Sequence, residues 1–267
     1  MTGIPVALIA TGCGLLGLLV GSFLNVVIHR VPRGLSLLRP ASHCPQCDQP
    51  VRVRHNVPVL GWLVLRGRCA DCRAPISARY PLVEAGTGAA FAVLGATFAD
   101  SWALPALLYL AAAGIALAVI DLDTHRLPNV IVLSSCVVVL ALLVGASAAD
   151  GAWDALGRAV LGGAASWALF GGIRLAWPGG MGGGDVKLAA LLGLMTGWLG
   201  WGVLAIGVFG GFLIGALVGV ALMAAGRAHR KTPVPFGPFL ITGAFIAVFA
   251  GAPLANAYVG LITGVTT

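Results

Sequence analysis

Long apolar stretches, separated from one another by short polar ones, account for most of the chain. Charge-free runs occupy residues 4–28, 101–120 and 127–149. Two further runs, residues 80–99 and 155–173, carry one charged residue each near an end. A helix of about 17 to 25 apolar residues is long enough to cross a bilayer. The pattern therefore predicts a membrane-spanning helix over each of these runs.

The apolar run over residues 188–226 is too long for a single span. Its glycines and tryptophans at residues 197–201 predict a turn, because glycine eases a tight bend and tryptophan favours the bilayer interface. A last run follows Phe236-Gly237-Pro238, and Pro253 is expected to break or end it. The chain is thus predicted to be an all-α polytopic membrane protein with about eight transmembrane helices.

Composition supports a membrane protein and excludes a soluble one. Apolar residues make up 59% of the chain and charged residues 9%, with a mean hydropathy of +0.98. In soluble proteins about a quarter of the residues are charged. In a soluble chain the net charge of +7 would suggest binding to nucleic acid. In a membrane protein the basic residues instead indicate which loops lie on the cytoplasmic side. We therefore expect the lipid bilayer as a partner and no nucleic acid.

The loop at residues 29–80 sets the predicted orientation, because basic loops mark the cytoplasmic side of a membrane protein. It contains nine arginines against only two aspartates, Asp48 and Asp71. With eight alternating spans, every other basic residue except Arg158 also falls on the cytoplasmic side, and both termini lie outside. The first run has no Lys or Arg before it, so it is expected to be a retained helix and not a secretory signal.

This pattern divides the chain into three predicted parts. Residues 1–28 form the first transmembrane helix, and residues 29–80 form the basic cytoplasmic loop. Residues 81–267 form a membrane domain of seven helices. A multi-pass protein of the plasma membrane, with its large loop in the cytoplasm, is the expected result.

Two acids stand at ends of apolar runs on the cytoplasmic side. Asp185 follows three glycines, Gly182 to Gly184, which allow a close approach of the backbone, and Asp121 ends an earlier run. Acids so placed usually face the bundle interior and mark a functional site. Asp185 taken alone could simply be a helix N-cap. Asp123 points away from Asp121 by about 200 degrees of helix rotation. It is expected to be a solvated loop acid, and Asp123 as the catalytic acid in place of Asp121 is the alternative.

A pair of close carboxylates can hold one proton between them near neutral pH. The ionised acid can then take a proton from water while the protonated one donates to a carbonyl oxygen, as in aspartic peptidases. The sequence contains no Ser-His-Asp arrangement at an exposed site and no His-Glu-x-x-His helix. Asp121 and Asp185 are therefore the candidate catalytic residues.

Four cysteines in the basic loop form two C-x2-C pairs with 21 residues between them: Cys44, Cys47, Cys69 and Cys72. This spacing is typical of a four-thiolate zinc site, in which each pair contributes two ligands of a tetrahedron. Two disulfides are the alternative, but a cytoplasmic loop is reducing. We expect a structural Zn²⁺, because sulfur fills all four positions. The loop stays basic with zinc bound, and so can lie on an anionic membrane surface.

Several segments together resemble the bifunctional type IV prepilin leader peptidases, membrane aspartic peptidases with a G-x-G-D motif. The similar segments span nearly the whole chain: residues 21–30, both cysteine pairs, residues 66–69, residues 76–84, residues 121–128, residues 182–188 and residues 235–239. By position, the catalytic aspartates of the family fall on Asp121 and Asp185. Asn129 stands where the family often has an acid.

The resemblance implies cleavage of a short basic leader from prepilin-like precursors at the cytoplasmic face of the inner membrane. It also implies methylation of the new N-terminal amine with S-adenosylmethionine. No G-x-G-x-x-G motif after a strand indicates where that cofactor would bind. Asn25, His29 and Glu84 are weak candidates for binding it, and helix packing is the favoured role for them. A peptidase without methyltransferase activity, a transporter and a non-enzymatic assembly factor are the alternatives.

Overall fold

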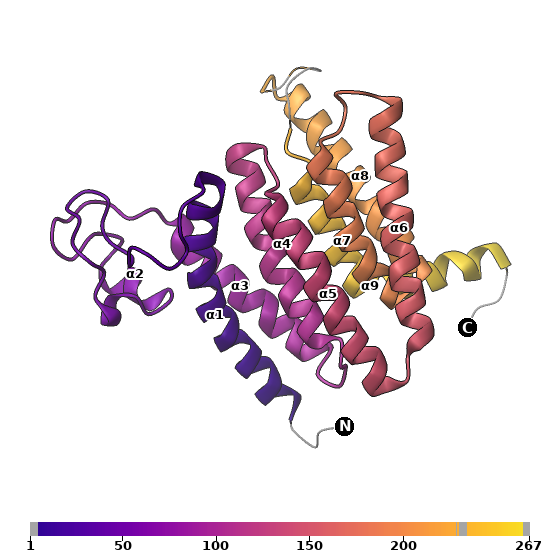
Figure 1. The fold of residues 1–267 in the computed structure, drawn as a ribbon, viewed down its shortest axis with the longest axis horizontal. Coiled ribbons are helices and arrows are strands. Elements are labelled where there is room, and N and C mark those ends of the chain that lie inside the picture. Colours follow the sequence, from indigo (N-terminus) through magenta and orange to yellow (C-terminus); the bar gives the residue numbers. More distant parts are fainter. Residues whose placement is uncertain (1–4, 228, 230–233, 264–267) are drawn as a thin grey trace. The chain divides into compact units, whose positions relative to one another are not determined.

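The computed structural model of the chain describes residues 5–227, 229 and 234–263. Over these residues it is helical, with isolated bridges and no strand (Figure 1). The helices are α1 (Val6–Arg30), α2 (Leu60–Val64), α3 (Arg79–Thr97), α4 (Leu104–Thr124), α5 (Asn129–Asp150), α6 (Trp153–Ala176), α7 (Gly183–Leu199), α8 (Trp201–Ala224) and α9 (Gly237–Thr263). Two short 3-10 turns, Val31–Arg33 and Val53–His55, lie in the first long loop.

The predicted all-α membrane architecture is confirmed. Each predicted span matches one long helix, and six of these helices are long and apolar enough to cross a membrane: α1, α4, α5, α6, α8 and α9. The other two are α3 with 19 residues and α7 with 17 residues. At about 1.5 Å per residue, α7 is slightly shorter than a hydrocarbon core of about 30 Å.

The predicted turn in the long apolar run is found between α7 and α8. Gly200 joins these helices with a φ of +150°, a conformation that side chains rarely adopt. The expected break at Pro253 is wrong, because α9 continues through this residue to Thr263. Neighbouring helices and local adjustment tolerate proline inside a membrane helix. The basic residues Arg230 and Lys231 lie outside the described residues.

The chain folds into two compact units, residues 1–116 and 117–267. In the first unit α1 packs closely on α3, because glycines of α1 face the backbone of α3. A Cβ added at Gly17 would lie 2.7 Å from the carbonyl oxygen of Thr87, and one at Gly21 would lie 2.7 Å from Cα of Glu84. Small residues at membrane-helix crossings allow this approach. The close crossing fixes α3 alongside a membrane-spanning helix.

In the second unit α7 lies against α5, α6, α8 and α9 (Figure 1). Glycines again form the crossing between α6 and α7: a Cβ added at Gly162 would lie 2.8 Å from the carbonyl oxygen of Gly193. Leu188, Leu191 and Met195 of α7 are fully buried. Helix α7 is therefore a central helix of this unit, and its N-terminus is held in place by its neighbours.

Candidate active site

Asp121 lies in the last turn of α4 and is buried, with 5% of its surface exposed. Asp123, two residues later, is exposed. This difference follows from the helix geometry, because residues two positions apart point in nearly opposite directions. The structure therefore presents Asp121, and not Asp123, to the interior of the second unit.

The carboxylate of Asp121 is fixed by the beginning of α9. Its Oδ2 accepts a hydrogen bond from the backbone N–H of Gly237 at 3.0 Å. Gly237 is the first residue of α9, where backbone N–H groups have no partner inside the helix. A Cβ at this position would lie 2.8 Å from the same Oδ2. Only glycine can therefore bring its N–H this close without displacing the carboxylate.

Asp185 lies in the first turn of α7, and its Oδ2 accepts a hydrogen bond from the N–H of Gly182 at 3.1 Å. The N-cap residue is Gly182, so the simple reading of Asp185 as the N-cap is wrong. Asp185 instead reaches back from the third helical position, as the acid of a capping box does. One carboxylate oxygen is thus tied to the backbone.

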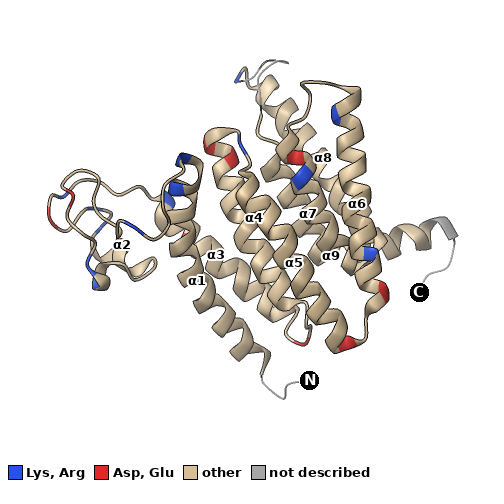
Figure 2. Cartoon of the chain, in the orientation of Figure 1, with Lys and Arg blue, Asp and Glu red and all other residues tan. Residues whose placement is uncertain are grey.

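Leu127 brings the two acidic segments together. A Cβ added at Gly184 would lie 2.9 Å from Cβ of Leu127, and one at Gly237 would lie 3.3 Å from its Cδ2. Asp121 and Asp185 lie close enough for their charges to interact. In Figure 2 acidic positions mark the end of α4 and the beginning of α7 at the same end of the second unit. The structure therefore groups the two candidate acids.

Basic side chains lie near the acids without neutralising them. The Lys187 Nζ donates to Oδ1 of Asn129 at 2.8 Å, which joins the beginning of α5 to α7. The Arg174 guanidinium lies against Gly183, where an added Cβ would be 3.1 Å from its Cζ. Among the described residues no ion pair involves Asp121 or Asp185. Both carboxylates thus remain available for proton transfer.

The four loop cysteines form a compact cluster in the first unit. Their sulfur atoms all lie within 4.8 Å of one another, and the Sγ atoms of Cys44 and Cys72 are 3.8 Å apart. A tetrahedron with Zn–S distances of about 2.3 Å has S–S edges of about 3.8 Å. All four cysteines are free thiols. The geometry fits a metal ion and does not support the disulfide alternative.

The two cysteine pairs have the same backbone turn. The N–H of Cys44 donates to Gln49 at 3.0 Å, and that of Cys69 donates to Ala74 at 2.8 Å. A residue with positive φ follows each pair, namely Asp48 and Arg73. A salt bridge of 2.7 Å between Arg52 and Asp71 joins the two turns. We call residues 43–75 the knuckle module.

The thiols of the knuckle module differ in their ionisation. Backbone N–H groups of Cys72 and Asp71 lower the pKa of Cys69 to about 7. The N–H of Gln49 also lowers the pKa of Cys47, but desolvation and the three neighbouring cysteines raise it to about 12. Four adjacent thiolates repel one another unless a cation compensates their charge. A divalent metal would supply that charge.

Comparisons with known proteins bear on both units. The bacterial peptidase A24 N-terminal domain matches residues 15–98, and the type IV leader peptidase family matches residues 107–220. A prepilin leader peptidase/N-methyltransferase of Aeromonas hydrophila is 38% identical, with 91% of each chain covered. The proteins of the same name from Stutzerimonas stutzeri and Pseudomonas aeruginosa are 36% identical, again with 91% of each chain covered. The chain belongs to the type IV leader peptidase family.

The family ranges include both acidic segments but not α9. No solved structure matches the chain. The bond from Gly237 to Asp121 therefore adds a third segment, beyond both matched ranges. Sequence reasoning missed this role of Gly237. The available signal was Gly-Pro at the start of an apolar run, since proline suits a first helical turn and the preceding N–H stays free.

The polar candidates for cofactor binding have structural partners within the first unit. The Asn25 amide donates to the carbonyl oxygen of Tyr80 at 3.2 Å, which links α1 to α3. Oε2 of Glu84 accepts the N–H of Val59 at 2.7 Å. Asn25 and Glu84 are buried, whereas His29 is exposed. These contacts support the favoured role in packing for Asn25 and Glu84.

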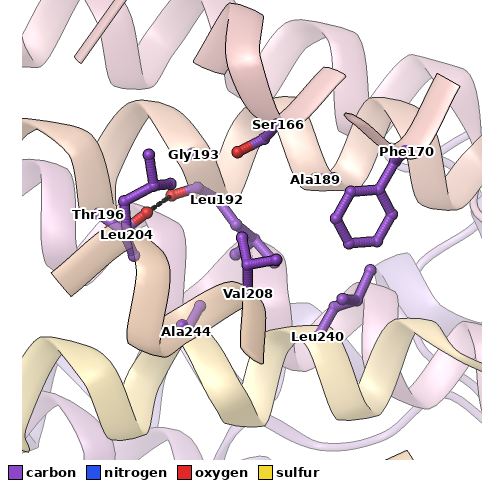
Figure 3. A pocket seen from close by; sticks show the side chains of 11 residues that line it. Ser166, Phe170, Ala189, Leu192, Gly193, Thr196, Leu204, Val208, Leu240 and Ala244 are labelled. Carbon is purple, nitrogen blue, oxygen red and sulfur yellow. Dashed lines mark hydrogen bonds between the residues drawn. The ribbon is translucent and has the colours of Figure 1, made fainter. Parts of the chain in front are cut away.

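A small cavity in the second unit lies apart from the acids. Its volume is about 20 Å³, room for one water molecule, and its lining comes from α6, α7, α8 and α9 (Figure 3). Apart from the hydroxyl groups of Ser166 and Thr196, the lining side chains are apolar. The cavity is too small for a peptide, so the candidate active site is the group of acids near Leu127.

Proposed function

We propose that the chain is an aspartic endopeptidase that removes the basic leader of type IV prepilin-like precursors. The observation that carries this proposal is the grouping of Asp121, at the end of α4, with Asp185, in the first turn of α7. Each acid has one oxygen bound to a backbone N–H, which leaves the other oxygen for water or substrate. Membership of the type IV leader peptidase family supports the assignment.

Hydrolysis by this pair needs no metal at the acids. The ionised acid takes a proton from water, whose oxygen attacks the carbonyl carbon, while the protonated acid donates to the carbonyl oxygen. The C–N bond then breaks: the leaving amine takes the proton that the first acid had received, and the second acid takes back a proton from a hydroxyl of the tetrahedral intermediate as the new carboxyl group forms. The backbone N–H of Gly237 and that of Gly182 keep the two carboxylates in position through these steps.

We further propose that the acids lie at the cytoplasmic side of the inner membrane. Around them in the second unit, Arg126, Arg174 and Lys187 lie in the segments at the same end. At the opposite end, where α5 is followed by α6, the charged residues are Asp150, Asp154 and Arg158 (Figure 2). An excess of basic residues marks the cytoplasmic side. The scissile bond would then lie at the inner interface.

Methylation of the new N-terminal amine is proposed as the second activity, because the curated relatives carry N-methyltransferase in their name. S-adenosylmethionine would supply the methyl group. The test is to incubate membranes that contain the chain with a synthetic precursor, with and without S-adenosylmethionine, and to weigh the products. We expect a shortened product in both and a methylated one only with S-adenosylmethionine. A shortened but unmethylated product in both reactions would mean that the chain has peptidase activity only. Intact precursor would favour an assembly factor or a transporter.

The metal of the knuckle module is proposed to be a structural Zn²⁺. We expect about one zinc per purified chain, measured by elemental analysis, because four thiolates close the coordination sphere. The substitution Cys47→Ser should lower the zinc content and expose residues 43–75 to limited proteolysis, since metal organises such a loop. Cys136→Ser in α5 is the matched control and should leave both unchanged. A zinc-free chain with four alkylatable loop thiols would contradict the assignment.

A further inference from the structure

Helix α2 presents an apolar face without a partner in the part of the first unit that the structure describes. Leu60, Leu63 and Val64 are 59%, 55% and 75% exposed. Residues three and four positions apart share one face of a helix. Val53, in the preceding 3-10 turn, is 88% exposed. Large apolar side chains gathered on a surface usually mark an interaction site.

The opposite side of α2 packs on the segment that follows it. The indole N–H of Trp62 donates to the carbonyl oxygen of Ile76 at 3.1 Å. A Cβ added at Gly67 would lie 2.7 Å from the indole ring, so the ring packs directly on this glycine. Gly61 is buried. The apolar face of α2 is therefore presented by a fixed helix.

The position of α2 along the membrane helices follows from Glu84. The N–H that Glu84 binds belongs to Val59, the N-cap of α2, whose φ of +61° is unusual for a β-branched residue. Glu84 lies in the second turn of α3 and directly beside Gly21 of α1. Five residues of helix measure about 7.5 Å. The beginning of α2 is therefore level with the second turn of α3, and α2 reaches only a short distance from it.

Unpaired positive charge surrounds this face. Arg54, Arg66 and Arg68 are exposed, and no ion pair to them is found among the described residues. Arg52 differs, since it is paired with Asp71. Guanidinium groups bind phosphate through paired N–H donors. Apolar side chains next to these arginines, beside the first turns of α3, match the lipid headgroups and the upper acyl chains.

We infer that α2 is an interfacial helix, which inserts Leu60, Leu63 and Val64 into the bilayer surface while Arg54, Arg66 and Arg68 bind lipid phosphates. The knuckle module then rests on the membrane beside α1 and α3. Its contact with Glu84 and its contact with lipid hold it from two sides. This inference does not depend on the peptidase assignment.

Photo-crosslinking on the full chain in lipid nanodiscs tests the inference. A benzoylphenylalanine is placed at Val64, and the same probe at Gln46, exposed in the first cysteine turn, sets the background. After irradiation, intact mass should show lipid adducts for the probe at Val64 well above that background. Adducts mainly to a second copy, or to another part of the chain, would overturn the inference.

Lipid composition separates the apolar contact from the charged one. With phosphatidylglycerol present, the probe should form more lipid adducts than in phosphatidylcholine alone. Each arginine near an anionic surface strengthens membrane binding by up to about fivefold. The variant with Arg66→Gln and Arg68→Gln should lose most of this difference while keeping its metal content. Equal adducts from both lipids in the unsubstituted chain would contradict the role given to the arginines.

Discussion

The substitutions Asp121→Asn and Asp185→Asn should each reduce precursor cleavage by about 10²- to 10⁴-fold, the usual contribution of a positioned acid or base. Asparagine has the shape of aspartate, and its amide oxygen can still accept the N–H of Gly237 or Gly182. The fold and membrane insertion should therefore survive while proton transfer fails. The rate of product formation in membranes with equal amounts of each variant provides the measurement.

Asp123→Asn is the matched control for these substitutions. Asp123 lies in the same last turn of α4 as Asp121 but is exposed, so its loss should change cleavage by less than about twofold. Normal processing by either paired-acid variant would contradict the proposed mechanism. A strong loss of cleavage in the Asp123 variant would show that the chemistry takes place on the other face of α4.

The substitution Gly237→Ala should lower kcat by about 10- to 100-fold, because small misplacement of a catalytic group costs up to about 10²-fold. An added Cβ would lie 2.8 Å from Oδ2 of Asp121 and would push the carboxylate or the start of α9 away. Since the change displaces an acid and not the peptide, KM should change less than kcat. Cleavage kinetics with a synthetic precursor measure both constants.

Gly219→Ala in α8 provides the control for this glycine, because no atom lies within 4 Å of the Cβ it would add. It should retain full activity. If Gly237→Ala also retains full activity, the contact between α9 and Asp121 has no role in catalysis. If both variants lose activity together with protein level, the loss reflects folding, and a thermal melt of the purified variants separates the two causes.

The sequence was sufficient to predict the long membrane helices and to propose both acids, for the same physical reason. Apolar runs have few alternatives to a membrane helix, and a charge at the end of such a run is costly unless it has a function. The pattern alone was therefore enough to single out Asp121 and Asp185 as candidates. The four cysteines were equally visible, because metal ligands require particular residue types at particular spacings.

Contacts made by backbone atoms were not visible in the sequence. The bond from Gly237 to Asp121 joins residues 116 positions apart, and its donor is an N–H group that every residue except proline possesses. Helix α2 was missed for a different reason, since five residues are too few for a periodic pattern. Its stability comes from Trp62 and from Glu84 in α3, which are tertiary contacts.

The interpretation of Asn129 also changes with the structure. This position was noted only because the family often has an acid there, yet its side chain accepts the Lys187 Nζ. The contact connects the beginning of α5 to the helix that carries Asp185. An amide is sufficient for this role, because the bond requires an acceptor oxygen and not a charge.

Binding of a precursor mimic with a hydroxyethylene group in place of the scissile bond tests the central claim most directly. Such a group resembles the tetrahedral intermediate, and analogues of this kind bind about 10²-fold or more tighter than substrates when the catalytic groups are in place. We predict tight binding to the unsubstituted chain and to Asp123→Asn, and a similar large loss of affinity in Asp121→Asn and in Asp185→Asn. Equally tight binding by either of the last two variants would contradict a site built from both acids.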